Sequence, residues 1–291
     1  MIYRQHGMIW KSVLAEQLRQ AEGAATVEEA ALRLVQRKLN SLNLNHPPFD
    51  LPLIASAVGI IPEFTSKPMT ESGRIVRVDG KHHIELKNTD SKHRQRFTAA
   101  HEIAHKMIDG TKIKGTKHRS DYDPAIEQLE EEKLCDLMGS FILGLSSDHI
   151  QPILADRGYS FETIEHIQNT FHVSFEAAAR SVTELYDDPA SVLFCSPIME
   201  VINGNSFAID KFVAAQSFPF YIYAKTWRLP FLCLRRAMQS DMLIRTTESW
   251  QIDETAAYQC AFAAKRMFFY VNKTRVEGVI VVVTDPKNSV A

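Results

Sequence analysis

The stretch His101-Glu102-Ile103-Ala104-His105 lies inside a segment with clear helical periodicity. Apolar residues recur around it at spacings of three and four, as on one face of an amphipathic helix: Phe97, Ala100, Ala104, Met107 and Ile108. Asp90 or Ser91 is a suitable N-cap, and Gly110 is suited to end the helix. The sequence therefore predicts a helix over residues 91–109 that carries both histidines along the border of its apolar face.

The spacing of the two histidines favours a shared metal ion. Residues four apart on a helix lie on the same face, so His101 and His105 can offer two imidazole nitrogens to one cation. Glu102 lies beside them, where its carboxylate can take a proton from a metal-bound water molecule. This H-E-x-x-H pattern is typical of the first part of a hydrolytic metal site. Two surface histidines on an ordinary amphipathic helix are the alternative that the spacing alone leaves open.

A later helix supplies candidates for a third ligand, which a catalytic site of this type requires. Asp123 and Pro124 are typical of a helix start, and an apolar periodic run follows them as far as Gly144. The helix carries three consecutive glutamates: Glu130, Glu131 and Glu132. The sequence therefore predicts that one of them completes the ligand set.

Glu132 is the favoured third ligand. Its face of the helix carries small neighbours (Ala125, Cys135 and Gly139), which would let the two helices approach closely. Asp136 lies one turn further along and can orient a histidine by accepting a hydrogen bond from it. Glu131 remains the competitor, because periodicity alone does not separate the two.

Further stretches follow one another in a specific order: Phe49-Asp50-Leu51-Pro52, Ser72-Gly73-Arg74, Arg94-Gln95-Arg96-Phe97-Thr98, Glu132-Lys133-Leu134-Cys135-Asp136 and Phe171-His172-Val173-Ser174. Together with the histidine motif they resemble the ImmA/IrrE-type metallo-endopeptidases of bacteria and mobile elements, over roughly residues 49–187. The register of the second helix in that family favours Glu132 as third ligand. The chain departs from the family at Met138, where Phe is usual, and at Leu143-Gly144-Leu145, where Leu-Met-Pro is usual.

The resemblance implies a metal-dependent endopeptidase in which His101, His105 and Glu132 hold zinc and Glu102 is the general base. Manganese or another divalent cation suits the same ligands. The implied substrate is a partner helix-turn-helix transcriptional repressor, whose cleavage would derepress stress or mobile-element genes. Two alternatives stay open: a regulatory binding module without hydrolysis, and a latent subunit of a toxin–antitoxin or defence assembly.

Composition and charge exclude other classes of protein. The chain of 291 residues is 45% hydrophobic and 23% charged, with a net charge of −2, so no global attraction to nucleic acid or anionic membrane is expected. No run approaches the length of a membrane span, and the stretch from Met1 to Gln20 lacks the apolar block of a signal peptide. The cysteines show no disulfide or metal-binding spacing, which favours a reducing compartment. We expect a cytoplasmic protein that binds neither membrane nor, directly, nucleic acid.

The predicted fold class is α+β. A helical extension over residues 1–48 precedes a mostly helical, zincin-like peptidase domain over residues 49–188, which contains a short set of strands. Residues 189–291 form a β-rich α+β domain that senses a small molecule or binds a partner, and a GAF-like fold is suggested for it by analogy alone. Within this last region a helix is predicted over residues 255–265 between the strands.

Overall fold

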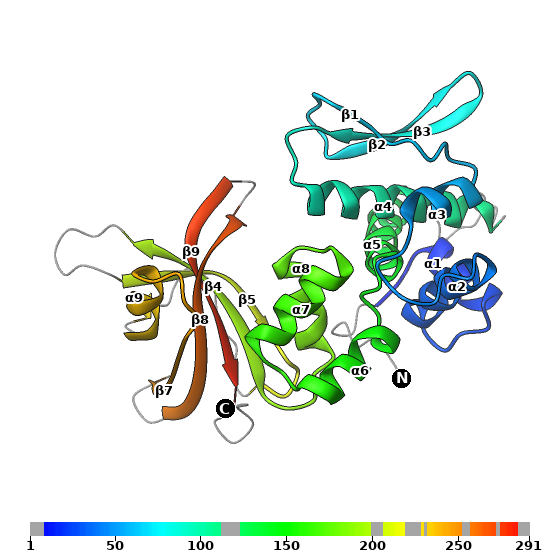
Figure 1. Cartoon of the computed structure of the whole chain (residues 1–291). Coiled ribbons are helices and arrows are strands. Elements are labelled where there is room, and N and C mark those ends of the chain that lie inside the picture. The colour runs from blue at the N-terminus through cyan, green and yellow to red at the C-terminus, as the bar shows by residue number, and fades with distance from the viewer. Residues whose placement is uncertain are drawn as a thin grey trace. The chain divides into compact units, whose positions relative to one another are not determined.

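The computed structural model describes residues 9–111, 123–198, 206–218, 228–229, 232–251, 257–271 and 274–284. The chain divides into two compact units (Figure 1). The first comprises Met1–His149 and Ile167–Ser174, and the second comprises Ile150–His166 and Phe175–Ala291. Among the described residues, no helix combines the length and the apolar character needed to cross a membrane.

The first unit combines helices with a small sheet. Its helices are α1 (Val13–Ala21), α2 (Val27–Ser41), α3 (Leu51–Ala57), α4 (Lys92–Gly110) and α5 (Pro124–Ile142). Its strands are β1 (Thr65–Lys67), β2 (Gly73–Val78) and β3 (Lys81–Lys87), in the order β1-β3-β2. β3 runs parallel to β1 and antiparallel to β2. Both β2 and β3 contact α4, so the sheet lies against the helix that carries the two histidines (Figure 1).

Local sequence signals fix where α4 and α5 begin. The Ser91 hydroxyl accepts a hydrogen bond from the backbone N–H of Arg94, and α4 starts at the next residue after Ser91. Asp123 caps α5 in the same way, and Pro124 occupies the first helical position. The two helices pack against each other, and a Cβ atom at Gly139 of α5 would lie only 3.3 Å from the backbone nitrogen of His101. The absence of a side chain at Gly139 therefore permits the close approach of the helices.

Two carboxylates on α5 hold the start of α1. Glu130 is buried and accepts hydrogen bonds from the backbone N–H groups of Lys11 (3.0 Å) and Ser12 (2.7 Å). Glu127 accepts hydrogen bonds from the N–H groups of the first two residues of α1. A helix start leaves such N–H groups without intrahelical acceptors, and its positive end attracts a negative charge. The start of α1 therefore restrains α5, although the two segments are more than a hundred residues apart in sequence.

Replacing Glu130 by Ala should destabilise the first unit. The change leaves the N–H groups of Lys11 and of the buried Ser12 without an acceptor, and we expect the free energy of unfolding to fall by about 2 to 3 kcal/mol. Urea denaturation followed by circular dichroism measures the difference. Asp109→Ala, which removes an exposed acid paired with Lys106, is the matched control and should change stability by less than about 0.5 kcal/mol. Equal stability of the two variants would show that the anchor contributes nothing.

The second unit is built on an antiparallel sheet. Its described strands are β4 (Ala190–Ile198), β5 (Ser206–Ala214), β6 (Arg228–Leu229), β7 (Ile244–Gln251), β8 (Ala257–Val271) and β9 (Thr274–Thr284), in the order β6-β5-β4-β9-β8-β7. Helix α9 (Leu232–Met238) contacts β7, β8 and β9, and α8 (Phe175–Glu184) contacts β4 and β5. Helices α6 (Ser147–Arg157) and α7 (Phe161–Phe171) each contribute residues to both units.

Side chains along β8 alternate between the two faces of the sheet, as strand geometry requires. Phe262 and Ala264 belong to an apolar core shared with Leu234 of α9. Ala263 and Lys265 lie on the opposite face and are half-buried. The Lys265 ammonium pairs with a carboxylate of α7, so α7 lies over this second face.

The predicted fold class is confirmed, because helices and a short strand set precede a β-rich α+β region. The helix predicted over residues 255–265 is wrong: from Ala257 onward the described residues form β8. The alanines of this segment favour a helix locally. Pairing with β7 on one side and β9 on the other, together with burial that alternates with a period of two, outweighs that preference. The sequence also gives no clear signal for the short helices α6 and α9.

Candidate metal centre

His101 and His105 lie one turn apart on α4, and their rings point to the same side of the helix. Their Nε2 atoms are 3.2 Å apart. Glu132 of α5 approaches both rings, with one carboxylate oxygen 3.3 Å from Nε2 of His101 and the other 3.6 Å from Nε2 of His105. The structure thus brings together the three residues that the sequence predicts as ligands, and their ligand atoms all lie within 4.8 Å of one another.

The spacing of these atoms fits a tetrahedral divalent ion. Zinc binds imidazole nitrogen and carboxylate oxygen at about 2.0 to 2.2 Å, so two ligand atoms at corners of a tetrahedron lie about 3.3 to 3.6 Å apart. The two Nε2 atoms lie 3.2 Å apart, and the Glu132 carboxylate lies 3.3 Å from Nε2 of His101 through one oxygen and 3.6 Å from Nε2 of His105 through the other. Three protein ligands leave the fourth corner for water or a substrate group, which is the arrangement of catalytic rather than structural sites.

Two more carboxylates of α5 orient the imidazole rings. Oδ1 of Asp136 lies 2.8 Å from Nδ1 of His101, and Oε1 of Glu131 lies 3.0 Å from Nδ1 of His105. Because an ionised carboxylate only accepts hydrogen bonds, both Nδ1 atoms must carry the proton. In the neutral rings each Nε2 atom then presents a lone pair, and the two lone pairs face each other. Such an arrangement is repulsive unless a cation or a proton lies between the rings.

The pKa values of His105 and Glu102 are both raised, so both groups hold a proton more readily than usual. Burial lowers the pKa of His105, but the hydrogen bond to Glu131 and the charges of Glu132, Glu102 and Glu131 outweigh it, and the net shift is upward. Burial raises the pKa of Glu102 above its ordinary value, and the charges of His101 and His105 offset only part of that rise. Glu102 therefore takes up a proton more readily than an exposed glutamate does.

The three consecutive glutamates of α5 contact three different groups. Glu130 binds the start of α1, Glu131 accepts a hydrogen bond from His105, and Glu132 approaches both histidines. Sequence alone does not separate Glu131 from Glu132 as third ligand, whereas in the structure Glu131 lies on the Nδ1 side of the ring.

Cys135 lies on α5 close to the same carboxylates, yet it does not join the candidate ligand set. Burial raises the pKa of its thiol, and the charges of Glu131 and Glu132 raise it further. The Cys135 side chain is fully buried, where it packs in the core of the first unit.

Comparison with known proteins assigns this part of the chain. Residues 62–183 match a family model described as the IrrE N-terminal-like domain, Peptidase_M78, and this range contains α4 and α5. A solved structure described as a Mycobacterium tuberculosis transcriptional regulator has a similar fold, with a TM-score of 0.52 and 13% sequence identity, over 94% of this chain and 81% of that chain. At this identity the likeness concerns the fold alone. No curated protein matches the sequence.

Filling the space at Gly139 should weaken the metal centre. A Val side chain there would collide with the backbone of His101 and move α5, with Glu132, away from the histidines. We expect Gly139→Val to lower zinc affinity at least about tenfold, by competition with a chromophoric chelator. Gly110→Ala is the matched control on α4, because a Cβ atom at Gly110 meets no other atom within 4 Å. Unchanged affinity in Gly139→Val would mean that this helix contact does not position Glu132.

The carboxylates of α5 should differ in their effect on metal binding. We expect Glu132→Gln to lower zinc affinity by more than about 100-fold, and Glu131→Gln or Asp136→Asn to lower it by about 10- to 100-fold, because the latter two only orient the histidines. The same chelator competition measures all three. Lys133→Gln, an exposed neighbour on the same helix, serves as control. A larger loss in Glu131→Gln than in Glu132→Gln would make Glu131 the third ligand.

Proposed function

We propose that this protein is a metal-dependent endopeptidase with its active centre at His101, His105 and Glu132, because residues 62–183 match the family model of the IrrE N-terminal-like domain, Peptidase_M78. One observation carries the proposal: two imidazole lone pairs face each other across 3.2 Å, beside a carboxylate that approaches both. That arrangement is repulsive unless a cation or a proton lies between the rings, and two imidazoles with one carboxylate form the three-ligand set that suits a catalytic metal ion.

The proposed reaction uses these residues in separate roles. His101, His105 and Glu132 hold a zinc ion, or manganese or another divalent cation that suits the same ligands. When bound, the ion acidifies a water molecule and polarises the scissile carbonyl. Glu102 accepts the proton that the water loses and passes it to the leaving amine. The raised pKa of Glu102 supports this role, because a carboxyl group closer to neutrality both accepts and returns a proton at the working pH.

Asp136 and Glu131 have positioning roles in the proposal. Their hydrogen bonds to the Nδ1 atoms keep both imidazoles in the tautomer that presents Nε2 to the ion. The rings cannot turn away without breaking these bonds, so the ligand geometry is set before any ion arrives.

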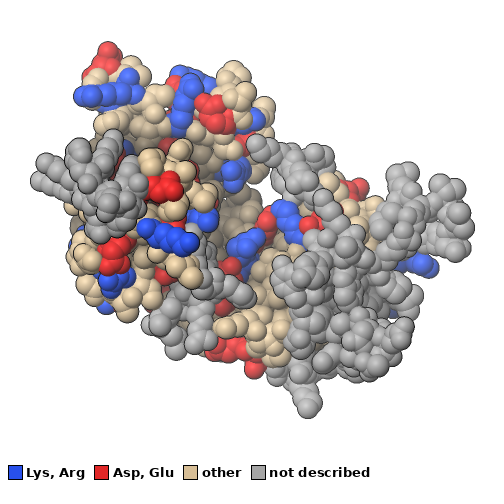
Figure 2. All heavy atoms as spheres, turned by 180° about the vertical axis from the view of Figure 1, so that it is seen from behind, with Lys and Arg blue, Asp and Glu red and all other residues tan. Residues whose placement is uncertain are grey.

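The substrate that we propose is a protein: a partner transcriptional repressor with a helix-turn-helix domain, whose cleavage derepresses stress or mobile-element genes. The family resemblance supports this choice, and the fold likeness to a transcriptional regulator is in line with it. On the face of the molecule in Figure 2, Lys and Arg side chains lie interspersed with Asp and Glu. This mixture suits a protein partner better than a phosphate backbone.

We also propose a cellular location for the protein and a role for each part of the chain. The four cysteines are buried and form no disulfide among the described residues, which is compatible with a reducing cytoplasm. Residues 1–48 act as a helical extension, residues 49–188 as the peptidase domain, and residues 189–291 as a domain that senses a small molecule or binds a partner.

A second candidate function is binding of a repressor without hydrolysis. The observation that favours it is the exposure of Glu132, whose side chain is 52% accessible, whereas a working metal ligand is commonly shielded from bulk water. A latent subunit of a toxin–antitoxin or defence assembly is a variant of this candidate, in which a partner covers the centre.

Glu102→Gln should separate the two candidates. If the protein is a peptidase, this variant keeps its zinc affinity, because Glu102 is not a ligand, and loses about 100- to 10,000-fold in cleavage rate. The measurement is gel analysis of a purified repressor encoded next to the gene, incubated with the wild type or the variant, with and without a chelator. Asp109→Asn, at an exposed position on α4, is the control for the charge change.

Each candidate function predicts a distinct result in this experiment. Chelator-sensitive fragments with the wild type and none with Glu102→Gln support hydrolysis with Glu102 as base. Fragments from both proteins at equal rates would exclude Glu102 from that role. A stable complex with an intact repressor in every condition would favour the binding function instead.

A further inference from the structure

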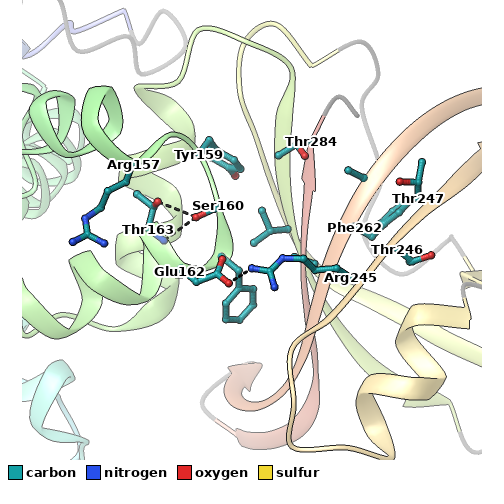
Figure 3. A pocket seen from close by; sticks show the side chains of 14 residues that line it. Arg157, Tyr159, Ser160, Glu162, Thr163, Arg245, Thr246, Thr247, Phe262 and Thr284 are labelled. Carbon is teal, nitrogen blue, oxygen red and sulfur yellow. Dashed lines mark hydrogen bonds and ion pairs between the residues drawn. The ribbon is translucent and has the colours of Figure 1, made fainter. Parts of the chain in front are cut away.

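The second unit contains a cavity of about 510 Å³ whose lining shares no residue with the candidate metal centre. Strands β7, β8 and β9 form its floor, and the segment from the end of α6 to the first turn of α7 forms its wall (Figure 3). This floor is the sheet face opposite the one that α9 covers. A hollow on this scale lies within the range of small-molecule sites, about 300 to 1,000 Å³.

The shape of the floor follows from the register of the strands. Ala263 on β8 lies between Arg245 on β7 and Val282 on β9. Two residues away, Ala261 lies between Thr247 and Thr284. Residues two apart on a strand share a face, so the two alanines form the middle of the floor. Their methyl groups fill less space than the larger side chains on either side, which leaves β8 as the bottom of the hollow.

The wall is held in place by contacts within the same unit. The Ser160 hydroxyl caps α7 by accepting from the backbone N–H of Thr163, at 3.1 Å. Glu162 in the first turn of α7 pairs with Arg245 of β7, and Glu165 one turn later pairs with Lys265 of β8 at 2.6 Å. These ion pairs hold α7 beside the alanines without covering them.

The polar groups of the cavity include hydrogen-bond donors that suit an anionic group. The lining contains two arginines, Arg157 and Arg245, and one acid, Glu162, which already pairs with Arg245. Figure 3 shows Arg245 reaching from the strands toward Glu162, whereas the head group of Arg157 points away from the strands. The hydroxyls of Thr247 and Thr284 flank the floor, and residues of the first turn of α7 line the same space. The pair with Glu162 engages one terminal nitrogen of the Arg245 guanidinium, and the other N–H groups of that guanidinium, with the two hydroxyls, are further hydrogen-bond donors of the lining.

We propose that this cavity binds a small organic acid, a molecule with one anionic group on a compact apolar body. Its carboxylate or phosphate oxygens lie against Arg245 and the two threonine hydroxyls, and its apolar body covers Ala261 and Ala263. A guanidinium group and an anionic oxygen form a charge-assisted hydrogen bond, which is stronger than a neutral one. The proposal does not depend on peptidase activity, because it uses no residue of the metal centre.

Four probes test the proposal on the full chain by isothermal titration calorimetry. Benzoate and phenyl phosphate each carry an anionic group on a flat apolar ring, benzamide is the neutral counterpart of benzoate, and inorganic phosphate lacks the apolar body. We expect benzoate or phenyl phosphate to bind at least about tenfold more tightly than both benzamide and inorganic phosphate. The better of the two anions tells whether the site prefers a carboxylate or a phosphate.

Two substitutions place the binding in this cavity. Ala263→Leu fills the floor and should lower the affinity for the better anion at least about tenfold. Ala208→Leu is its matched control, since Ala208 lies on β5 of the same sheet and outside the lining. Arg245→Gln should lower the affinity to a similar extent, and Arg245→Lys should recover part of it. If Ala263→Leu also lowers the midpoint of thermal unfolding, its loss of affinity can come from lost stability. The substitutions of Arg245, whose side chain is exposed, then decide whether the probe binds in this cavity.

Three results would overturn the proposal. Equal affinity for benzoate and benzamide would show that no anionic group is recognised. Wild-type affinity in both Ala263→Leu and Arg245→Gln would place the bound probe elsewhere. No measurable heat from either anionic probe at millimolar concentration would remove the case for an organic-acid site.

Discussion

Two imidazole nitrogens that face each other across 3.2 Å impose the main constraint on the first unit. Each ring donates its Nδ1–H to a carboxylate, so neither ring can relieve the repulsion by moving that proton to Nε2. Glu132 and Glu102 add two further negative groups, and their charges raise the pKa of His105. A divalent cation reduces both the repulsion between the lone pairs and the repulsion among the carboxylates. The helix packing of this unit thus supports a centre that is favourable only when it holds positive charge.

Helix α5 determines whether this centre forms, because consecutive residues on a helix point about 100° apart. Its rotation about its own axis decides which of Glu130, Glu131 and Glu132 meets which group. The start of α1 fixes that rotation by holding Glu130, and Gly139 fixes the distance to α4. A turn of α5 by one residue would bring Glu131 to the position of Glu132 and Glu130 to that of Glu131, and it would leave Lys11 and Ser12 without their acceptor. The ligand set therefore depends on an anchor distant in sequence from any metal-binding motif.

Sequence predicts the parts of this structure that local rules govern. The caps Ser91 and Asp123 are visible as residue types at helix starts, and the four-residue spacing of His101 and His105 fixes their common side. The choice between Glu131 and Glu132 is not visible, because periodicity gives angles within α5 but not its rotation against α4. Sequence periodicity also does not show which segments pair. The segment from Ala257 has a local preference for helix, but it forms a strand because it pairs with β7 and β9. The hollow over Ala261 and Ala263 likewise appears only once three strands are in register.

The chain passes from one unit to the other after His149, after His166 and after Ser174. No single cut in the polypeptide can therefore release either unit intact. Excision after His149 would discard Phe171, which lies beside Gly144 at the end of α5, and excision before Phe175 would deprive the second unit of the first turn of α7. Segments of the two units alternate along the backbone. Producing either unit by itself would therefore require joining segments that are separate in the sequence.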